Sequence, residues 1–178
     1  MPGRAALAVC LLAVACGPRV DVHGERSRIA TFGRYGTYAW ATPAAPAGSV
    51  GEQDAALLDW RIRNAVDRGL AAKGYVRSEG AASLLADYDV VTRPEDGAPF
   101  RDYFRDRRRD GDSRFAADGY PEGSLVLHLV DARTGEIAYR SSATSVIAAD
   151  VDRQRLDDAV GRMLGDLPRA MVTGREAR

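Results

Sequence analysis

Apolar residues recur with a helical period in two segments of the chain. Between residues 54 and 73 they share one face, and Gly74 is expected to end that helix. The cap at its start is either Asp54 or, one turn earlier, the capping-box pair Ser49 and Glu52. A second stripe of apolar residues lies between residues 152 and 167, ahead of Pro168, which cannot continue a helix. The spacing therefore predicts two helices, each with one apolar face to bury.

Other segments show the composition and alternation of β-strands, at 29–40, 84–92, 124–130 and 136–147, with a short return at 75–76. The turn residues at 132–135 join two of these strands into a hairpin. A hairpin-rich sheet can bury the apolar stripes of both helices. We therefore predict an α+β fold, a two-layer sandwich in which two helices pack on one face of an antiparallel sheet of about four or five strands.

Strand 124–130 is apolar on both sides, which predicts a central strand with His128 half-buried in it. Leu57 and Trp60 point away from the apolar face of the first helix. The sequence leaves two interpretations for Trp60, a point of interaction or a ring covered by a neighbouring loop, and we favour the loop.

A long segment, 94–121, carries mixed charges interleaved with aromatic rings and is bounded by prolines. A loop of this length in a compact domain is either functional or disordered. A run of charges is most often a solvated face. The rings could instead fold back over the outer face of the sheet near Val126 and Val130, or order against a partner. Between these two we favour the partner slightly.

The N-terminus has the pattern of an export signal. Arg4 precedes an apolar run, Ala5 to Ala15, which is too short to span a bilayer core of roughly 20 residues. Small residues precede Cys16 directly, as in a bacterial lipobox, where the cysteine is acylated and becomes the first residue of the mature protein. We predict a lipoprotein signal peptide at 1–15 and lipid attachment at Cys16. Plain periplasmic export is the alternative.

After cleavage Cys16 is the one cysteine left, so no disulfide can form within the mature chain, and acylation removes an exposed free thiol. Residues 16–28 are predicted to form a flexible tether, residues 29–172 a single α+β domain, and residues 173–178 a disordered tail. Because Gly17 rather than aspartate follows the cysteine, sorting to the outer membrane, facing the periplasm, is expected. The membrane is thus one predicted partner, through the lipid anchor.

Charge and motifs exclude several function classes. The 25 basic and 25 acidic residues balance, which gives no electrostatic basis for binding nucleic acid. His23 and His128 are not at metal-ligand spacing, and the pair Asp87 and Asp89 is interpreted as a solvated acidic pair on one strand. The sequence also lacks a Gly-x-Ser-x-Gly elbow. We therefore predict a protein that is not an enzyme, with no catalytic residue, metal or cofactor.

Several short segments resemble, in order, a bacterial outer-membrane lipoprotein family catalogued as domain of unknown function 4136. They are Phe32 to Trp40, Leu70 to Tyr75, Ala86 to Val90, Glu122 to Gly135 and the helix ending at Pro168. Relatives usually carry tryptophan after the hairpin turn, where this chain has Tyr139-Arg140-Ser141-Ser142. The family brings no known catalytic residues.

We expect an interaction or assembly lipoprotein that contacts an unidentified envelope protein. The alternative is a carrier or sensor that holds a small apolar ligand between the sheet and the helices; the ligand would be unknown.

Overall fold

The computed structural model describes residues 20–28, 30–41, 43, 50–91, 121, 123–147 and 152–171. The predictions for the signal peptide, for lipid attachment at Cys16, for the body of the 94–121 loop and for the 173–178 tail lie outside these residues.

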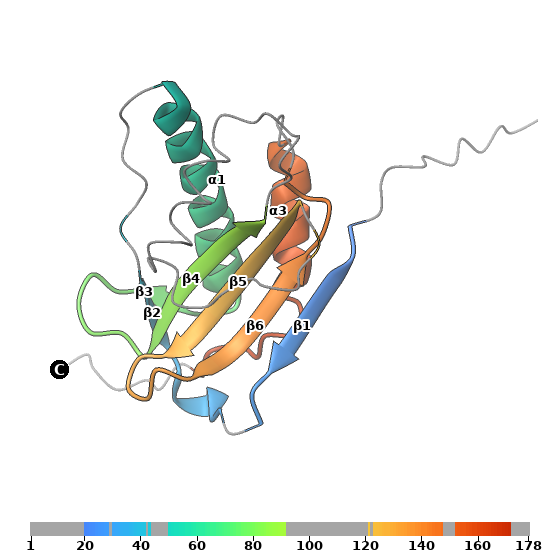
Figure 1. Ribbon diagram of the computed structural model, residues 1–178. Helices are drawn as coiled ribbons and strands as arrows, with labels where there is room; N and C mark the ends of the chain where they lie inside the picture. Colours follow the sequence, from blue (N-terminus) through green and yellow to red (C-terminus); the bar gives the residue numbers. More distant parts are fainter. Residues whose placement is uncertain are drawn as a thin grey trace, which may run out of the picture.

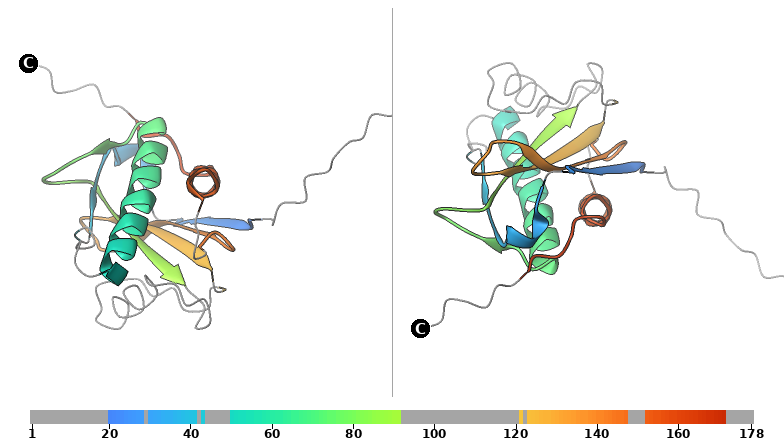
Figure 2. Two further views of the ribbon diagram at one scale, coloured as in Figure 1. Left: turned by 90° about the horizontal axis from the view of Figure 1, so that it is seen from above. Right: turned by 90° about the horizontal axis from the view of Figure 1, so that it is seen from below.

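The described residues form one sheet and two α-helices (Figure 1). The strands are β1 (Val22–Arg26), β2 (Thr37–Trp40), β3 (Val76–Arg77), β4 (Leu84–Val91), β5 (Ser124–Asp131) and β6 (Ile137–Ala143). The helices are α1 (Val50–Ala72) and α3 (Arg153–Met163), with a short 3-10 turn, η1 (Phe32–Arg34), ahead of β2. Both α-helices lie on one face of the sheet (Figure 2). The α+β class and the placement of the helices are as predicted.

The sheet differs from the prediction in size and direction. It has six strands among the described residues, in the order β1-β6-β5-β4-β2-β3, and it is mixed rather than antiparallel. Strand β2 runs parallel to both β3 and β4. A parallel pair needs a crossover connection, and α1 supplies it between β2 and β4. Residues 29–40 were predicted as one strand, but the strand itself begins at Thr37, after η1.

The predicted tether is wrong where it meets the sheet. Strand β1 lies within 16–28 and pairs antiparallel with β6, from Val22 opposite Ala143 to Arg26 opposite Tyr139. Gly24 permits this pairing, since a Cβ at that position would lie 3.0 Å from the Tyr139 hydroxyl oxygen beneath it. The ordered domain therefore begins well before residue 29.

Helix α1 ends where the sequence predicts, ahead of Gly74, whereas α3 ends at Met163, four residues before the predicted end at Leu167. At the end of α1, the Tyr75 amide donates to the Leu70 carbonyl and the Gly74 amide to the Ala71 carbonyl, with Gly74 at φ +90°. This pair of bonds is a Schellman motif, which requires a residue that tolerates positive φ. Helix α1 begins at Val50, which agrees with the earlier of the two starts that the sequence allows. Asp152 caps α3 by accepting from the Gln154 amide.

One core fills the space between the sheet and the helices. The predicted stripe of α3 is buried in full, and α1 contributes a matching stripe. Tyr38, Tyr88 and Tyr139 are buried in this core, and the hydroxyl group of each donates a hydrogen bond. The largest fully buried aliphatic residues are Ile62, Leu70, Leu84, Leu125, Leu127, Leu129, Leu156 and Met163.

Candidate functional site

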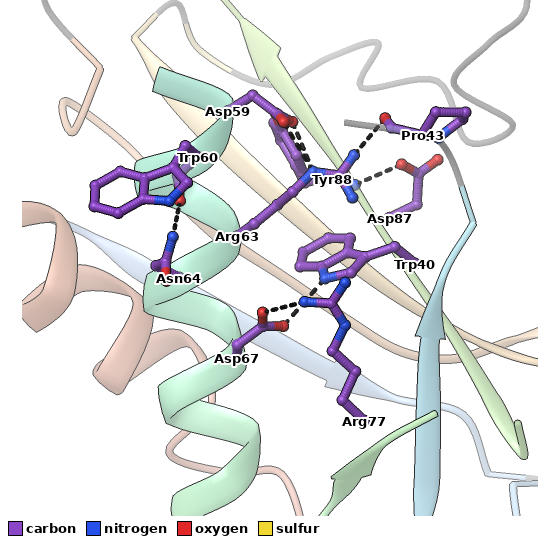
Figure 3. Close-up of polar contacts among 10 residues, drawn as sticks. All are labelled: Trp40, Pro43, Asp59, Trp60, Arg63, Asn64, Asp67, Arg77, Asp87 and Tyr88. Atoms are coloured by element: carbon purple, nitrogen blue, oxygen red, sulfur yellow. Dashed lines mark hydrogen bonds and ion pairs between the residues drawn. The ribbon is translucent and has the colours of Figure 1, made fainter. Parts of the chain in front are cut away.

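Four ionisable side chains form a transverse row on the face of the sheet that the helices leave open. Asp87 pairs with His128, His128 with Arg140, and Arg140 with Glu25, across strands β4, β5, β6 and β1. Their strand neighbours, such as Tyr88, Leu127 and Tyr139, belong to the core, so the row lies on the opposite face, and at its β4 end Figure 3 draws the Asp87 carboxylate toward Arg63 of α1. We call this set the outer-face row.

A chain of polar contacts orients Arg140 within this row. The Arg140 Nε donates to His128 Nδ1 at 3.3 Å, and His128 Nε2 lies 3.5 Å from Asp89 Oδ2. Because Nδ1 accepts, the neutral imidazole carries its proton on Nε2, facing the carboxylate. The ring is fully buried and its Nδ1 accepts from Arg140, so His128 presents no basic nitrogen to solvent. These contacts instead fix the orientation of the Arg140 guanidinium.

A groove of about 770 Å³ lies along β1 and β6, beside the row. Most of the residues that line it are polar, and they carry both signs of charge, with hydroxyl groups between them. The lining residues are Asp21, His23, Gly24, Glu25, Pro121, Arg140, Ser141, Ser142, Thr144 and Ser145. The polar groups of such a surface can hydrogen-bond a ligand.

A second polar cluster joins α1 to the sheet on the helix side (Figure 3). Arg63, 8 % exposed, donates through Nε to both oxygens of the buried Asp59, at 2.8 and 3.0 Å. It also donates to the Pro43 carbonyl at 2.7 Å, and its guanidinium carbon lies 4.5 Å from the centre of the Trp40 ring. The Tyr88 hydroxyl donates to Asp59 as well. This cluster fixes the position of α1 rather than presenting chemistry to solvent.

Asp67 anchors the next turn of α1 to β2 and β3. It accepts from the Tyr38 hydroxyl at 2.8 Å, from Trp40 Nε1 at 3.1 Å and from Arg77 at 3.1 Å. Burial, reinforced by the hydrogen bond to Asp67, raises the pKa of Tyr38, so its hydroxyl stays protonated and remains a donor at neutral pH. The contact is thus a structural one.

Asp131 organises the end of the β5–β6 hairpin. Its Oδ1 accepts from the amides of Arg133 and Thr134, and its Oδ2 accepts from the Tyr35 hydroxyl at 2.8 Å. Burial alone would raise its pKa, but these hydrogen bonds and the nearby Arg34 outweigh burial and the pKa is lowered. A polar cavity of about 170 Å³ opens beside this cluster.

The structure alters the interpretation of several residues singled out in the sequence. Asp87 and Asp89 share one strand face as predicted, but they are buried rather than solvated. His128 is fully buried rather than half-buried. His23 lies in β1, not in a tether. Trp60 is 53 % exposed, so the loop cover that we favoured is wrong.

Sequence reasoning did not select Arg140, Glu25 or Arg63. Arg140 and Glu25 become partners of the row only through strand register, which the sequence does not display. Asp59 and Arg63 are four residues apart on a helix, the spacing of an ion pair, and that signal could have drawn attention to them.

Within the described residues, no group of three or more histidine, cysteine, aspartate or glutamate side chains is arranged to hold a metal ion. Nor does that part of the chain include a helix long and apolar enough to cross a membrane.

Comparison with known proteins identifies relatives of the same fold. The model of the family described as a domain of unknown function, DUF4136, matches residues 22–169. A DUF4136 family protein from Bacteroides thetaiotaomicron VPI-5482 is 14% identical, with a TM-score of 0.52 over 82% of this chain and 94% of that one. At this identity, the likeness shows a shared fold.

Two further solved structures are more distant. A PelC variant from Paraburkholderia phytofirmans, in a dodecamer, is 13% identical over 85% of this chain and 98% of that one, with a TM-score of 0.46. A PDZ domain protein from Parabacteroides distasonis ATCC 8503 is 12% identical over 86% of this chain and 37% of that one, with a TM-score of 0.49. No curated protein matches the chain.

Proposed function

The chain belongs to the DUF4136 family, and we propose that it is a lipid-anchored interaction protein of the bacterial cell envelope. In this proposal Cys16 carries the lipid, the signal peptide at 1–15 is removed, and the domain faces the periplasm from the outer membrane. One face of α1 contacts an envelope protein.

Support for the anchor comes from the sequence around Cys16. The basic residue Arg4, the short apolar run and the small residues before the cysteine together match a lipobox. One acyl chain gives only marginal binding, whereas two or three give stable anchoring. Gly17 after the cysteine favours the outer membrane over retention at the inner one.

Replacement of the cysteine tests this part directly. Cys16→Ser is expected to abolish incorporation of labelled palmitate and to move the protein from the membrane fraction to the soluble fraction, because serine offers no thiol for acylation. The measurement is labelling followed by fractionation of cells that express each form. Cys10→Ser is the matched control, since Cys10 leaves with the signal peptide and its loss should change neither result. Palmitate labelling that survives in Cys16→Ser would contradict the anchor.

The exposed Trp60 is the observation that carries the interaction role. Trp60 is 53 % exposed and Leu57, three residues earlier on the same face of α1, is 45 % exposed. We call these two residues the α1 patch. Figure 3 draws Trp60 turned away from the cluster around Arg63. Tryptophan dominates the energetics of many protein interfaces, and its ring contributes little to the fold when it is left in solvent.

A photo-crosslinking residue at position 57 tests this surface. In intact envelopes it is expected to capture one partner, and the additional change Trp60→Ala should remove the adduct because the anchoring ring is gone. The soluble domain should keep its melting temperature in Trp60→Ala, since exposed substitutions change stability by only about 0.5 kcal/mol. A crosslinker at Ala132, in the exposed hairpin turn, is the control position. Equal adducts at 57 and 132, or adducts insensitive to Trp60, would contradict the proposal.

The carrier alternative receives less support. An apolar ligand between sheet and helices would need space there, and that interface is filled by side chains such as Ile62, Leu127 and Leu156, each fully buried. The groove along β1 and β6 and the cavity beside Asp131 are both lined largely by polar residues.

A further inference from the structure

The position of β1 places the folded domain very near the proposed lipid attachment. Val20 already packs against the core, and its carbonyl lies 3.4 Å from a terminal nitrogen of Arg162. The Asp21 carbonyl accepts from the Thr144 amide at 3.0 Å, and β1 begins at the next residue. Val20 is therefore already in contact with the folded domain.

Only four residue steps separate Cys16 from Val20. Whatever conformation the intervening residues adopt, a chain of that length spans at most about 14 Å. A lipidated Cys16 lies at the bilayer surface, so Val20 must lie within that distance of it. A tether through residue 28 would have allowed roughly 40 Å and left the orientation of the domain free.

The residues around Val20 define which part of the domain this is. Strand β1 is one edge of the sheet, and α3 packs beside it (Figure 1). Two arginines of α3 lie near the start of β1. Arg162 donates to the Val20 carbonyl, and Arg155 donates to the Ser145 carbonyl. They are seven residues apart, so they lie on one side of α3, about 10 Å from each other along its axis. We call the surface formed by the start of β1 and this side of α3 the anchor edge.

We infer that the anchor edge rests on the phospholipid headgroups, so that the opposite edge of the sheet, at β3, faces away from the bilayer. This inference rests on the proposed attachment at Cys16. The short connection supplies the constraint: the anchor edge is held at the headgroups by its distance from Cys16 and not by net charge, because the exposed Asp21 and Asp158 lie beside Arg155 and Arg162. Held in this way, the domain presents the β3 side of the sheet to the periplasm.

Two glycines provide matched probe positions, one on α3 next to the anchor edge and one near the opposite edge of the sheet. A Cβ at Gly161, next to Arg162 on α3, or at Gly80, between β3 and β4, would meet no atom within 4 Å. Each can therefore be changed to cysteine and labelled without repacking. The test uses full-length lipidated protein in phosphatidylethanolamine–phosphatidylglycerol vesicles, with a fluorophore at 161 or 80 and spin-labelled headgroup lipids as quenchers.

The fluorophore at Gly161→Cys is expected to be quenched several-fold more than the fluorophore at Gly80→Cys. Insertion of fifteen Gly/Ser residues after Gly17 should remove most of that difference, because the constraint is the length of the connection. Equal quenching at the two positions, or a difference that the insertion leaves unchanged, would overturn the inference. Flotation with the vesicles is scored in every sample. Failure of the native protein to float would instead count against the lipid anchor itself.

Discussion

Val160→Asp is expected to unfold the domain. Val160 is fully buried on the face of α3 that packs against α1, where its Cγ1 approaches Gly69. An aspartate there would place a charge in the core with no partner, at a cost of several kcal/mol. The total stability of a domain of this size is about 5–15 kcal/mol. The soluble domain should therefore lose its cooperative thermal transition, as followed by circular dichroism.

The adjacent position supplies the control for this change. Gly161 is exposed and faces open space, so Gly161→Asp adds the same charge to the same helix without burying it. That variant is expected to melt close to the native domain. If Val160→Asp melted at the same temperature as Gly161→Asp, the apolar stripe of α3 would not be core, and the two-layer packing would be wrong.

Arg63→Met is expected to destabilise the domain by about 3–5 kcal/mol. The substitution keeps much of the side-chain volume but leaves the Asp59 carboxylate, 2 % exposed, without its cationic partner. It also removes the donor to the Pro43 carbonyl and the cation that lies over the Trp40 ring. Urea denaturation of the soluble domain measures the free energy of unfolding.

The double variant separates loss of the ion pair from loss of packing. Asp59→Leu together with Arg63→Met removes both charges, and replacing a buried pair by apolar residues is often neutral or stabilising. The double variant should therefore be more stable than Arg63→Met alone. Arg68→Met is the surface control. Its ion pair with Asp157 is about half exposed at the arginine, and such pairs contribute at most about 1 kcal/mol. Equal losses in the single and double variants would contradict the assigned role of Asp59.

The strongly periodic elements of the fold could be predicted from the sequence. The stripe of α3, the end of α1 at Gly74 and the β5–β6 hairpin all followed from spacing and turn residues. Strand β1 could not be predicted in this way, because its sequence, VHGER, is that of an exposed edge strand with little apolar content. The parallel pairing of β2 depends on the crossover through α1. The sequence of a four-residue strand does not indicate whether the strand pairs parallel or antiparallel to its neighbours.

The polar sites were harder to predict than the fold. Asp87, Asp89 and His128 stood out because they interrupt apolar strands, and that signal was sound. Their interpretation as solvated or half-buried residues failed, since burial on the outer face depends on tertiary structure rather than on alternation. Arg140 is joined to them only by strand register. Trp60 was correctly placed off the apolar face, but no pattern in the chain specifies whether a loop covers it.

The central claim is that Cys16 is the acylated first residue of the mature protein. Tryptic digestion of protein purified from membranes should release the peptide Cys16-Gly17-Pro18-Arg19, and its mass measures the claim directly. We predict that this peptide carries two or three acyl chains and that no peptide from residues 1–15 accompanies it. Recovery of the same peptide with an unmodified thiol, or of an N-terminal peptide that still contains the apolar run, would contradict the claim.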